Sequence, residues 1–144
     1  MLYLEKPSDF KDPQEIVGCF VECKGKILLL HRQDHKQHGN SYGPPGGKVD
    51  PEDASLDDAM RREIFEETGL RIAEGKLQFI IDFYVRYPER DFIYHQYRTV
   101  FDEFPKVTVH DKEHKGYVWV TPEEALTMSL IHDEDECIKY VYKR

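Results

Sequence analysis

The alternation of apolar and polar residues along the chain predicts a sheet of several strands. Two apolar runs, Ile16 to Cys23 and Lys26 to His31, are separated by a lysine and a glycine, which is the pattern of a β-hairpin. Leu77 to Tyr87 and Phe92 to Phe104 are rich in aromatic and β-branched residues and flank a polar turn, so we expect two long antiparallel strands. Gly116 to Val120 predicts a further short strand.

Helical periodicity and capping residues predict helices in three places. Ser55 is an N-cap residue, apolar residues recur at helical spacing after it, and Gly69 is suited to the C-terminal cap. A second helix starts at Thr121, which is followed by Pro122 and then by glutamates. The last helix is expected from Asp133 to Tyr142, and its acidic first residues lie where a helix favours negative charge. The order of elements indicates an α+β fold, a sandwich with a mixed sheet.

The remaining segments are predicted to be irregular. Met1 to Gln14 is expected to form an arm or an irregular edge, and His31 to Tyr42 is expected to form a polar loop. The run Gly43-Pro44-Pro45-Gly46-Gly47 argues against a regular helix or a central strand, so a shaped loop is expected. Because there is no internal repeat or interdomain linker, residues 1–144 are predicted to form a single domain with residues 1–14 as its N-terminal arm.

Charge and composition argue against several classes of protein. The 144 residues carry 20 Lys and Arg against 28 Asp and Glu, a net charge of −8, which disfavours a protein that coats nucleic acid or binds anionic membranes. A small anionic substrate is compatible with this charge if a divalent cation mediates the contact. The three cysteines suggest no disulfide framework, and the N-terminal residues lack the apolar stretch of a signal peptide. A cytoplasmic protein is therefore predicted.

Three glutamates of the first predicted helix are the main candidates for chemistry. Glu63, Glu66 and Glu67 are spaced i, i+3 and i+4, which places their carboxylates on one face of the helix. Such like charges repel one another unless something neutralises them, and hard carboxylate oxygens suit Mg²⁺ or Mn²⁺. The alternative is a solvated acidic face with Arg61 and Arg62 as partners within the helix.

The loop before this helix favours the metal interpretation. Gly46 and Gly47 allow the backbone to approach closely, so that a carbonyl oxygen can join a metal site. Lys48 follows them and can approach a phosphate as a point charge. Together, the glycines, the lysine and the acidic helix favour a metal-assisted phosphate site over a solvated acidic face.

The segment Gly47 to Leu70 resembles the Nudix box, whose pattern is G-x5-E-x7-R-E-U-x-E-E-x-G-U with U a bulky aliphatic residue. The second half of the box, Arg62 to Leu70, is intact. The first half is one residue longer than the pattern, and the insertion falls in the turn from Pro51 to Ala54. Asp53 or Glu52 could therefore substitute for the first glutamate of the box.

The segments 27–32 and 117–126 are likewise typical of Nudix proteins. The resemblance implies the Nudix α/β/α sandwich with a mixed sheet. It also implies a MutT-like hydrolase that depends on Mg²⁺ (or Mn²⁺) and cleaves a diphosphate linkage in a nucleoside diphosphate derivative. Sanitising the nucleotide pool and cleaving dinucleoside polyphosphates are both activities of this kind.

The resemblance also assigns roles to individual residues. The metal would be held by the Gly46 carbonyl, Glu63, Glu66 and Glu67. Either Glu66 or Glu67 would also act as the general base. Arg62 would orient the glutamates through a salt bridge, with Asp53 as its structural support.

Further candidates lie outside the box. Glu113 is predicted to supply a base or an additional metal ligand, as loop residues after the central strands do in other members, and Glu103 is the second choice. The alternative for Glu113 is a solvated loop charge. Arg32, Lys48 and Tyr42 are the candidate substrate-binding residues, with packing as the alternative for Tyr42 and a surface position as the alternative for Arg32.

Two other functions occur on the same fold. A Nudix-fold module that senses a nucleotide without cleaving it is the main alternative, although such modules usually lose the box glutamates that this chain keeps. An isoprenyl diphosphate isomerase is disfavoured because Cys19 and Cys23 precede the box without a matching motif. His31, His35 and His38 favour a solvated or substrate-lining loop over a zinc site. The expected partner is a small-molecule nucleotide diphosphate, with no large nucleic acid and no membrane, and the chain is expected to be a monomer or a homodimer.

Overall fold

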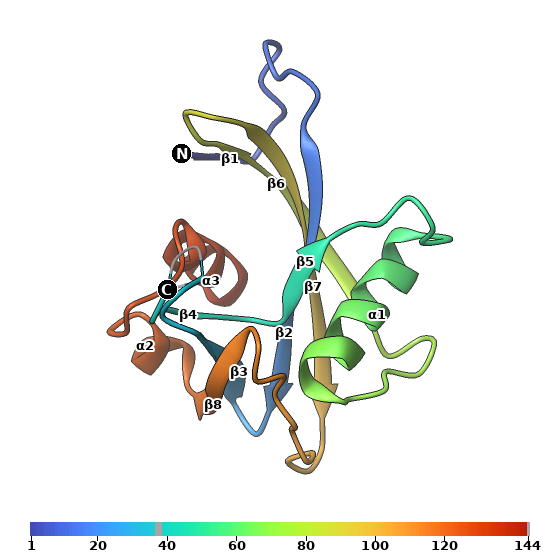
Figure 1. Cartoon of the computed structure of the whole chain (residues 1–144), viewed down its shortest axis with the longest axis vertical. Helices are drawn as coiled ribbons and strands as arrows, with labels where there is room; N and C mark the ends of the chain where they lie inside the picture. Colours follow the sequence, from blue (N-terminus) through green and yellow to red (C-terminus); the bar gives the residue numbers. More distant parts are fainter. Residues whose placement is uncertain (37–38, 144) are drawn as a thin grey trace.

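The computed structural model describes residues 1–36 and 39–143, and Figure 1 shows its strands and helices. The strands are β1 (Leu2–Tyr3), β2 (Gln14–Cys23), β3 (Lys26–Arg32), β4 (Tyr42–Gly43), β5 (Gly46–Lys48), β6 (Gln78–Arg86), β7 (Asp91–Phe101) and β8 (His114–Val120). The helices are α1 (Leu56–Thr68), α2 (Pro122–Ala125) and α3 (Glu134–Tyr142). Among the described residues, no helix has the length and apolar character needed to cross a bilayer.

The strands form one mixed sheet in the order β1-β6-β7-β2-β3-β4, with β5 paired to β2 and β8 paired to β3. β2 is parallel to β7 and antiparallel to both β3 and β5. It changes neighbour along one edge, since Ile16 to Gly18 pair with β5 whereas Glu22 and Cys23 pair with β3. The predicted α+β sandwich with a mixed sheet is confirmed.

Alternating side chains build a core on each face of the sheet. On β3, Leu28 and Leu30 pack in the core that faces α1, whereas Ile27 and Leu29 pack in the core that faces α2 and α3. Figure 1 shows α1 on one side of the sheet and α2 with α3 on the other. β3 is an unbroken apolar run because both of its faces are covered.

The helix ends follow the capping residues that the sequence predicts. The Ser55 side chain accepts a hydrogen bond from the Asp58 N–H at 3.1 Å. Gly69 adopts a φ of 76°, which favours glycine, and its N–H donates to the Phe65 carbonyl. Thr121 begins α2 with a reciprocal capping box. These local interactions fix where α1 starts and stops, and hence which face of α1 carries its glutamates.

The structure corrects the prediction for the glycine–proline run, and it adds a short edge strand within the N-terminal residues. Instead of a loop throughout, residues 42–43 and 46–48 form the short strands β4 and β5. A Cβ at Gly46 would overlap with the Val17 carbonyl of β2, so this pairing depends on glycine. Leu2 and Tyr3 form β1, which pairs with β6 at the edge of the sheet. Because β5 lies against β2, the backbone around Gly46 is held beside α1.

Candidate active site

Arg62 lies at the centre of a group of acidic side chains on and before α1. Its Nε and Nη2 donate to the two carboxylate oxygens of Asp53 at 2.9 and 3.0 Å. Its Nη1 donates to Glu63 at 3.0 Å and to Glu66 at 3.2 Å, and Nη2 also donates to the Lys48 carbonyl at 3.1 Å. The hydrogen bonds to Asp53 raise the pKa of Arg62 and lower the pKa of Asp53. Arg62 therefore keeps its charge and offsets the repulsion between the neighbouring glutamates.

The turn before α1 absorbs the extra residue of the box. In this turn the Asp53 N–H donates to the Asp50 carbonyl at 3.0 Å, and the Asp50 N–H donates to the Asp53 carboxylate at 2.8 Å. The turn carries the Asp53 side chain onto Arg62. The contact that the family pattern would give to a glutamate is thus made here by a shorter acid.

Glu63 packs against the backbone of β5. A Cβ at Gly47 would lie 2.6 Å from the Glu63 carboxylate, so only glycine permits this approach. Burial raises the pKa of Glu63, and the Arg62 guanidinium acts in the opposite direction. The glycine loop and the helix therefore place a partly desolvated carboxylate directly on the backbone of the loop.

Glu67 is buried at the same junction, with 6 % of its surface exposed. Its Oε1 accepts a hydrogen bond from the Gly46 N–H at 2.7 Å, which orients the carboxylate. Burial raises the pKa of Glu67 well above its ordinary value, and the Gly46 N–H opposes the rise. A cation bound beside Glu67 would favour the ionised form, because it would replace the solvation that burial removes.

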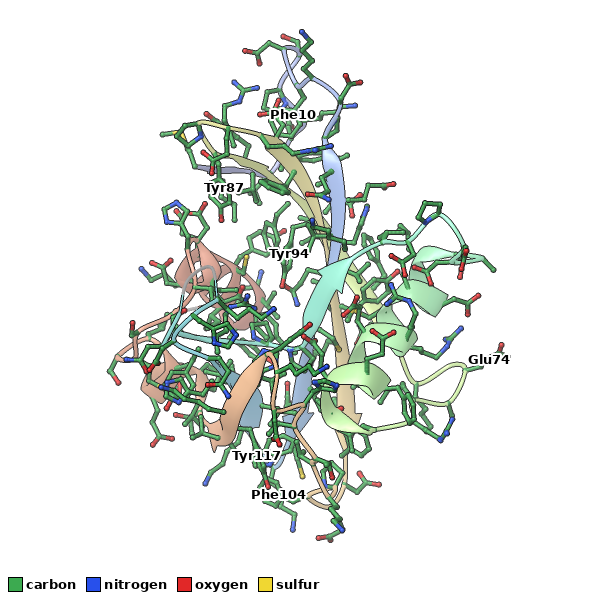
Figure 2. All side chains as sticks on the ribbon, viewed as in Figure 1. Phe10, Glu74, Tyr87, Tyr94, Phe104 and Tyr117 are labelled. Atoms are coloured by element: carbon green, nitrogen blue, oxygen red, sulfur yellow. The ribbon has the colours of Figure 1, made fainter. Side chains whose placement is uncertain are left out.

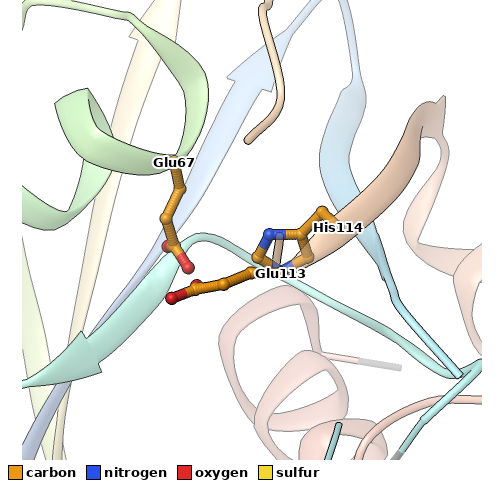
Figure 3. Close-up of side chains that lie close together, drawn as sticks. All are labelled: Glu67, Glu113 and His114. Atoms are coloured by element: carbon orange, nitrogen blue, oxygen red, sulfur yellow. The ribbon is translucent and has the colours of Figure 1, made fainter. Parts of the chain in front are cut away.

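Glu113, immediately before β8, and His114, its first residue, lie beside Glu67 (Figure 3). One ligand atom from each of the three side chains lies within 4.8 Å of the other two. A tight turn places them, since the N–H groups of Glu113 and His114 both donate to the His110 carbonyl, at 3.1 and 3.0 Å. Glu113 is exposed and His114 is buried. Burial, together with the charge of Arg32, lowers the pKa of His114 to about 4, so its imidazole is neutral near pH 7.

The donor set around α1 fits a divalent cation. Glu63, Glu66 and Glu67 present carboxylates on one helical face. Glu113, from the turn before β8, adds another carboxylate close to that of Glu67 (Figure 3). Mg²⁺ and Mn²⁺ are bound through carboxylate oxygens and keep several positions for water and substrate phosphate. Partly and fully buried carboxylates with raised pKa values, such as Glu63 and Glu67, are the groups that such a cation would stabilise.

A cavity of about 330 Å³ extends from this acidic region to α3. Its wall near α1 includes Arg32, Gly46, Lys48, Glu67 and His114. The rest of its wall includes Tyr87, Phe92, Tyr94, Asp133 and Glu134. Figure 2 shows Tyr87 and Tyr94 between the β6–β7 hairpin and α3. The cavity is at the lower end of the size range of small-molecule sites and combines aromatic surface with polar groups.

The acidic run lies in the first turn of α3, as predicted, and one of its members is buried. Glu134 has only 2 % of its surface exposed, and its Oε1 has no hydrogen-bond partner within the described part of the chain. Burial, with the charges of Asp135 and Asp133, raises the pKa of Glu134 to about 8. Asp133 Oδ2 also lacks a hydrogen bond there, although it lies 3.4 Å from the amino nitrogen of Met1. This end of the cavity therefore offers unsatisfied polar atoms.

Other predicted residues lie apart from the acidic region. Tyr42 stacks on His31 with 4.1 Å between the ring centroids and does not line the cavity. Glu103 forms an exposed ion pair with Lys24 at 3.0 Å. His38, the third member of the histidine group, lies outside the described residues.

Comparison with known proteins agrees with this geometry. A family model described as the NUDIX domain matches residues 12–143. The chain belongs to the Nudix family. It is 34 % identical over 119 residues to the CTP pyrophosphohydrolase of Escherichia coli K12, and the alignment covers 81 % of this chain and 82 % of the relative. The chain is thus a MutT-like Nudix pyrophosphohydrolase, as the box predicted.

Solved structures share the Nudix fold over nearly the whole chain. The E. coli ORF135 protein has a TM-score of 0.75 and 26 % identity, with 96 % of this chain and 94 % of that chain covered. The MutT protein from Methanosarcina mazei has a TM-score of 0.73 and 26 % identity, with 94 % and 100 % covered. The NUDIX domain of Shewanella oneidensis NrtR, solved with ADP ribose, has a TM-score of 0.79 but 19 % identity, with 97 % and 93 % covered, and so shows likeness of fold alone.

Sequence reasoning about the Nudix box did not identify His114, Glu134 or Tyr94 as residues near the site. His114 directly follows Glu113. The sequence therefore pointed to the right loop but not to its histidine. Glu134 gave no local signal, because its burial depends on how α3 packs. Tyr94 is one of nine tyrosines, and nothing in the sequence distinguishes it. Its place became clear from the structure, in which a Cβ at Gly18 of β2 would overlap with the Tyr94 hydroxyl.

Proposed function

We propose that this Nudix hydrolase is a divalent-metal-dependent pyrophosphohydrolase of nucleoside triphosphates, which cleaves the diphosphate linkage to give a nucleoside monophosphate and pyrophosphate. CTP is the first candidate substrate, because the CTP pyrophosphohydrolase of E. coli aligns over about four fifths of both chains. The observation that carries the proposal is the cavity that connects Glu67 to the aromatic and polar wall near α3. The cavity would hold the phosphates beside Glu67 and the nucleoside in the adjoining region near α3.

The acidic face of α1 would hold the cation. Glu63, Glu66 and Glu67, with the Gly46 carbonyl, would bind Mg²⁺ or Mn²⁺, which when bound would neutralise charge on the phosphates and make water more acidic. Arg62 supports this face through its hydrogen bonds to Glu63 and Glu66.

The chain's own side chains would bind the phosphates and move a proton. Arg32 and Lys48 line the cavity and would bind phosphate oxygens. A carboxylate must accept the proton of the attacking water. Glu67 is our first choice for this general base, since burial and the Gly46 N–H hold it in one orientation. Glu113, whose carboxylate lies close to that of Glu67, is the second choice for the general base. Glu66 is the third choice.

The nucleoside would occupy the part of the cavity that is lined by Tyr87, Tyr94 and Glu134. A nucleobase has a flat face, which suits aromatic surface, and an edge with donors and acceptors, which suits an unsatisfied carboxyl group. At neutral pH the raised pKa of Glu134 keeps its carboxyl largely protonated, so it can both donate and accept. A buried polar group that finds its partner only in the complex would contribute to affinity.

The test is a substrate panel measured with Mg²⁺: CTP, dCTP, UTP, ATP, GTP, ADP-ribose and a diadenosine polyphosphate, with pyrophosphate and monophosphate products quantified. We expect a triphosphate to be cleaved most efficiently, with CTP the leading candidate. If the folded wild-type protein cleaves no member of the panel, the hydrolase proposal fails. Nucleotide binding without cleavage would instead support the sensing module, which the retained Glu63, Glu66 and Glu67 argue against.

A pair of variants tests the placement of the nucleoside. Glu134→Leu should raise KM for the preferred nucleotide at least about tenfold while changing kcat less than about threefold, because it removes a binding contact remote from the phosphates. Glu136→Leu, at an exposed position on the same helix, is the matched control and should change neither parameter. Equal KM values for wild type and Glu134→Leu would place the nucleoside elsewhere.

The state of the cysteines bears on the location of the protein. Cys19, Cys23 and Cys137 are all buried and unpaired. Thiols that stay reduced are typical of a reducing compartment, which supports the proposed cytoplasmic location.

A further inference from the structure

We propose that Glu67, Glu113 and His114 form a metal site of mixed oxygen and nitrogen donors, which binds Mn²⁺ or Co²⁺ in preference to Mg²⁺. The inference rests on the proposed function, because it names the cation of the same site. It goes beyond that function because His114 lies outside the Nudix box, and hydrolysis through the glutamates does not require an imidazole.

The three side chains come from two elements that meet at the cavity. Glu67 is near the end of α1, whereas Glu113 immediately precedes β8 and His114 is the first residue of β8 (Figure 3). Their ligand atoms lie within 4.8 Å of one another. Two ligands on opposite sides of an ion with bonds of about 2.1 Å are about 4.2 Å apart, so only a small shift is needed to close the site. The exposed side chain of Glu113 can supply that shift by rotation.

His114 provides the independent sign of a ligand. Its side chain lines the cavity with only 3 % of the residue exposed, and Nδ1 has no hydrogen-bond partner among residues 1–36 and 39–143. Buried polar side-chain atoms are nearly always paired, so an unpaired ring nitrogen on a buried histidine that lies next to two carboxylate side chains is unusual. A bound cation would provide the missing partner for the imidazole, and would also offset the repulsion between Glu67 and Glu113.

The neighbouring groups hold the site in place. The Gly46 N–H binds one oxygen of Glu67, which leaves the orientation of that carboxylate fixed. The shared His110 carbonyl fixes the backbone of Glu113 and His114. Arg32 is a cationic neighbour on the cavity wall, and its charge opposes a cation there, whereas the carboxylates of Glu67 and Glu113 favour one.

The imidazole determines which cation is preferred. Mg²⁺ favours oxygen ligands and retains its waters, so a nitrogen donor adds little to its binding. First-row transition ions accept imidazole readily, and Mn²⁺ and Co²⁺ also accept carboxylates. A site that combines both kinds of donor therefore discriminates between cations that the box glutamates alone would bind similarly.

The test uses the metal alone, without nucleotide. Mn²⁺ is titrated into the apo-protein and followed by electron paramagnetic resonance, and pulsed measurements detect ¹⁴N coupled to the bound ion. We expect imidazole ¹⁴N modulation in the wild type and a Kd for Mn²⁺ at least about tenfold lower than for Mg²⁺. His114→Gln should lose the modulation and weaken Mn²⁺ binding at least about tenfold, while the Kd for Mg²⁺ changes less than about threefold.

Two further variants keep the test decisive. Glu113→Gln changes an exposed side chain, so its effect on folding should be small, and it should weaken Mn²⁺ binding at least about fivefold. His110→Gln replaces an exposed histidine nearby and should leave the ¹⁴N modulation unchanged. Absence of modulation in the wild type, or its persistence in folded His114→Gln, would overturn the proposal.

The outcome is separable from that of the proposed function. A wild-type protein that shows the ¹⁴N coupling but cleaves no nucleotide would refute the hydrolase proposal alone. A wild-type protein that cleaves nucleotides with Mg²⁺ but shows no ¹⁴N coupling would refute the mixed-donor site alone.

Discussion

We expect the wild-type protein to lose stability between mildly acidic and alkaline pH, and we expect replacing Glu134 by glutamine to remove that loss. Glu134 is buried, and burial raises the pKa of its carboxyl from 4.5 to about 8. The folded protein therefore holds a proton that the unfolded chain releases as pH rises above 4.5. Its contribution to stability is complete below pH 4.5 and is lost as pH rises through about 8.

The magnitude follows from the difference between the two pKa values. The pKa rises from 4.5 to about 8, a difference of about 3.5 units, and each unit corresponds to about 1.4 kcal/mol. The full effect at high pH is therefore on the order of 4 to 5 kcal/mol. The N–H groups at the start of α3 favour the carboxylate by up to about 1 kcal/mol, so we expect about 4 kcal/mol. A glutamine has nearly the shape of the protonated acid and carries no charge at any pH. The Glu134→Gln variant should therefore not lose this stability as the pH rises.

Urea unfolding at pH 5, 7 and 9, without nucleotide, measures the difference directly. The free energy of unfolding of Glu134→Gln relative to wild type should be smallest at pH 5 and should increase by about 4 kcal/mol between pH 5 and pH 9. Glu136→Gln, at an exposed position on α3, is the control and should show a flat difference. A difference for Glu134→Gln that varies by less than about 1 kcal/mol over this range would refute the reasoning.

Two glycine substitutions test the contacts on either side of the cavity. Gly18→Ala should raise KM for the preferred nucleotide about fivefold or more, because its Cβ would overlap with Tyr94, whereas Gly116→Ala, which has no atom within 4 Å of the added Cβ, should not. Equal KM values for these two variants would remove Tyr94 from the nucleotide site. Gly47→Ala should weaken Mg²⁺ binding, measured by calorimetry, about tenfold, because its Cβ would lie 2.6 Å from the Glu63 carboxylate. Unchanged Mg²⁺ affinity would argue that Glu63 is not a ligand.

The elements that could be predicted from the sequence are those that local interactions specify. The capping box at Thr121 and the cap at Gly69 act within a few residues, and the structure shows both. The strand β5 could not be predicted, because three residues with two glycines carry no strand propensity of their own. β5 forms because Gly46 and Gly47 let the backbone approach β2, which is distant in sequence.

The candidate site likewise combines residues that could be predicted from local sequence with residues that could not. The common face of Glu63, Glu66 and Glu67 follows from helical spacing alone, and so could be predicted. The roles of His114 and Glu134 depend on burial, which is decided by where β8 and α3 pack against the sheet. A histidine or glutamate that is exposed in one packing and desolvated in another has the same local sequence in both. Residues of this kind can be recognised as candidate site residues only when the structure of the cavity that they line is known.

The central claim is that Glu67 acts at the catalytic centre of a metal-dependent nucleoside triphosphate pyrophosphohydrolase, and kcat for CTP with Mg²⁺ tests it most directly. The wild type should release pyrophosphate from CTP. Glu67→Gln should lower kcat at least about 100-fold, with its thermal unfolding still cooperative, because one strong charge-stabilising group is lost. A decrease of less than about tenfold in folded Glu67→Gln would contradict the claim and move the role of general base to Glu113.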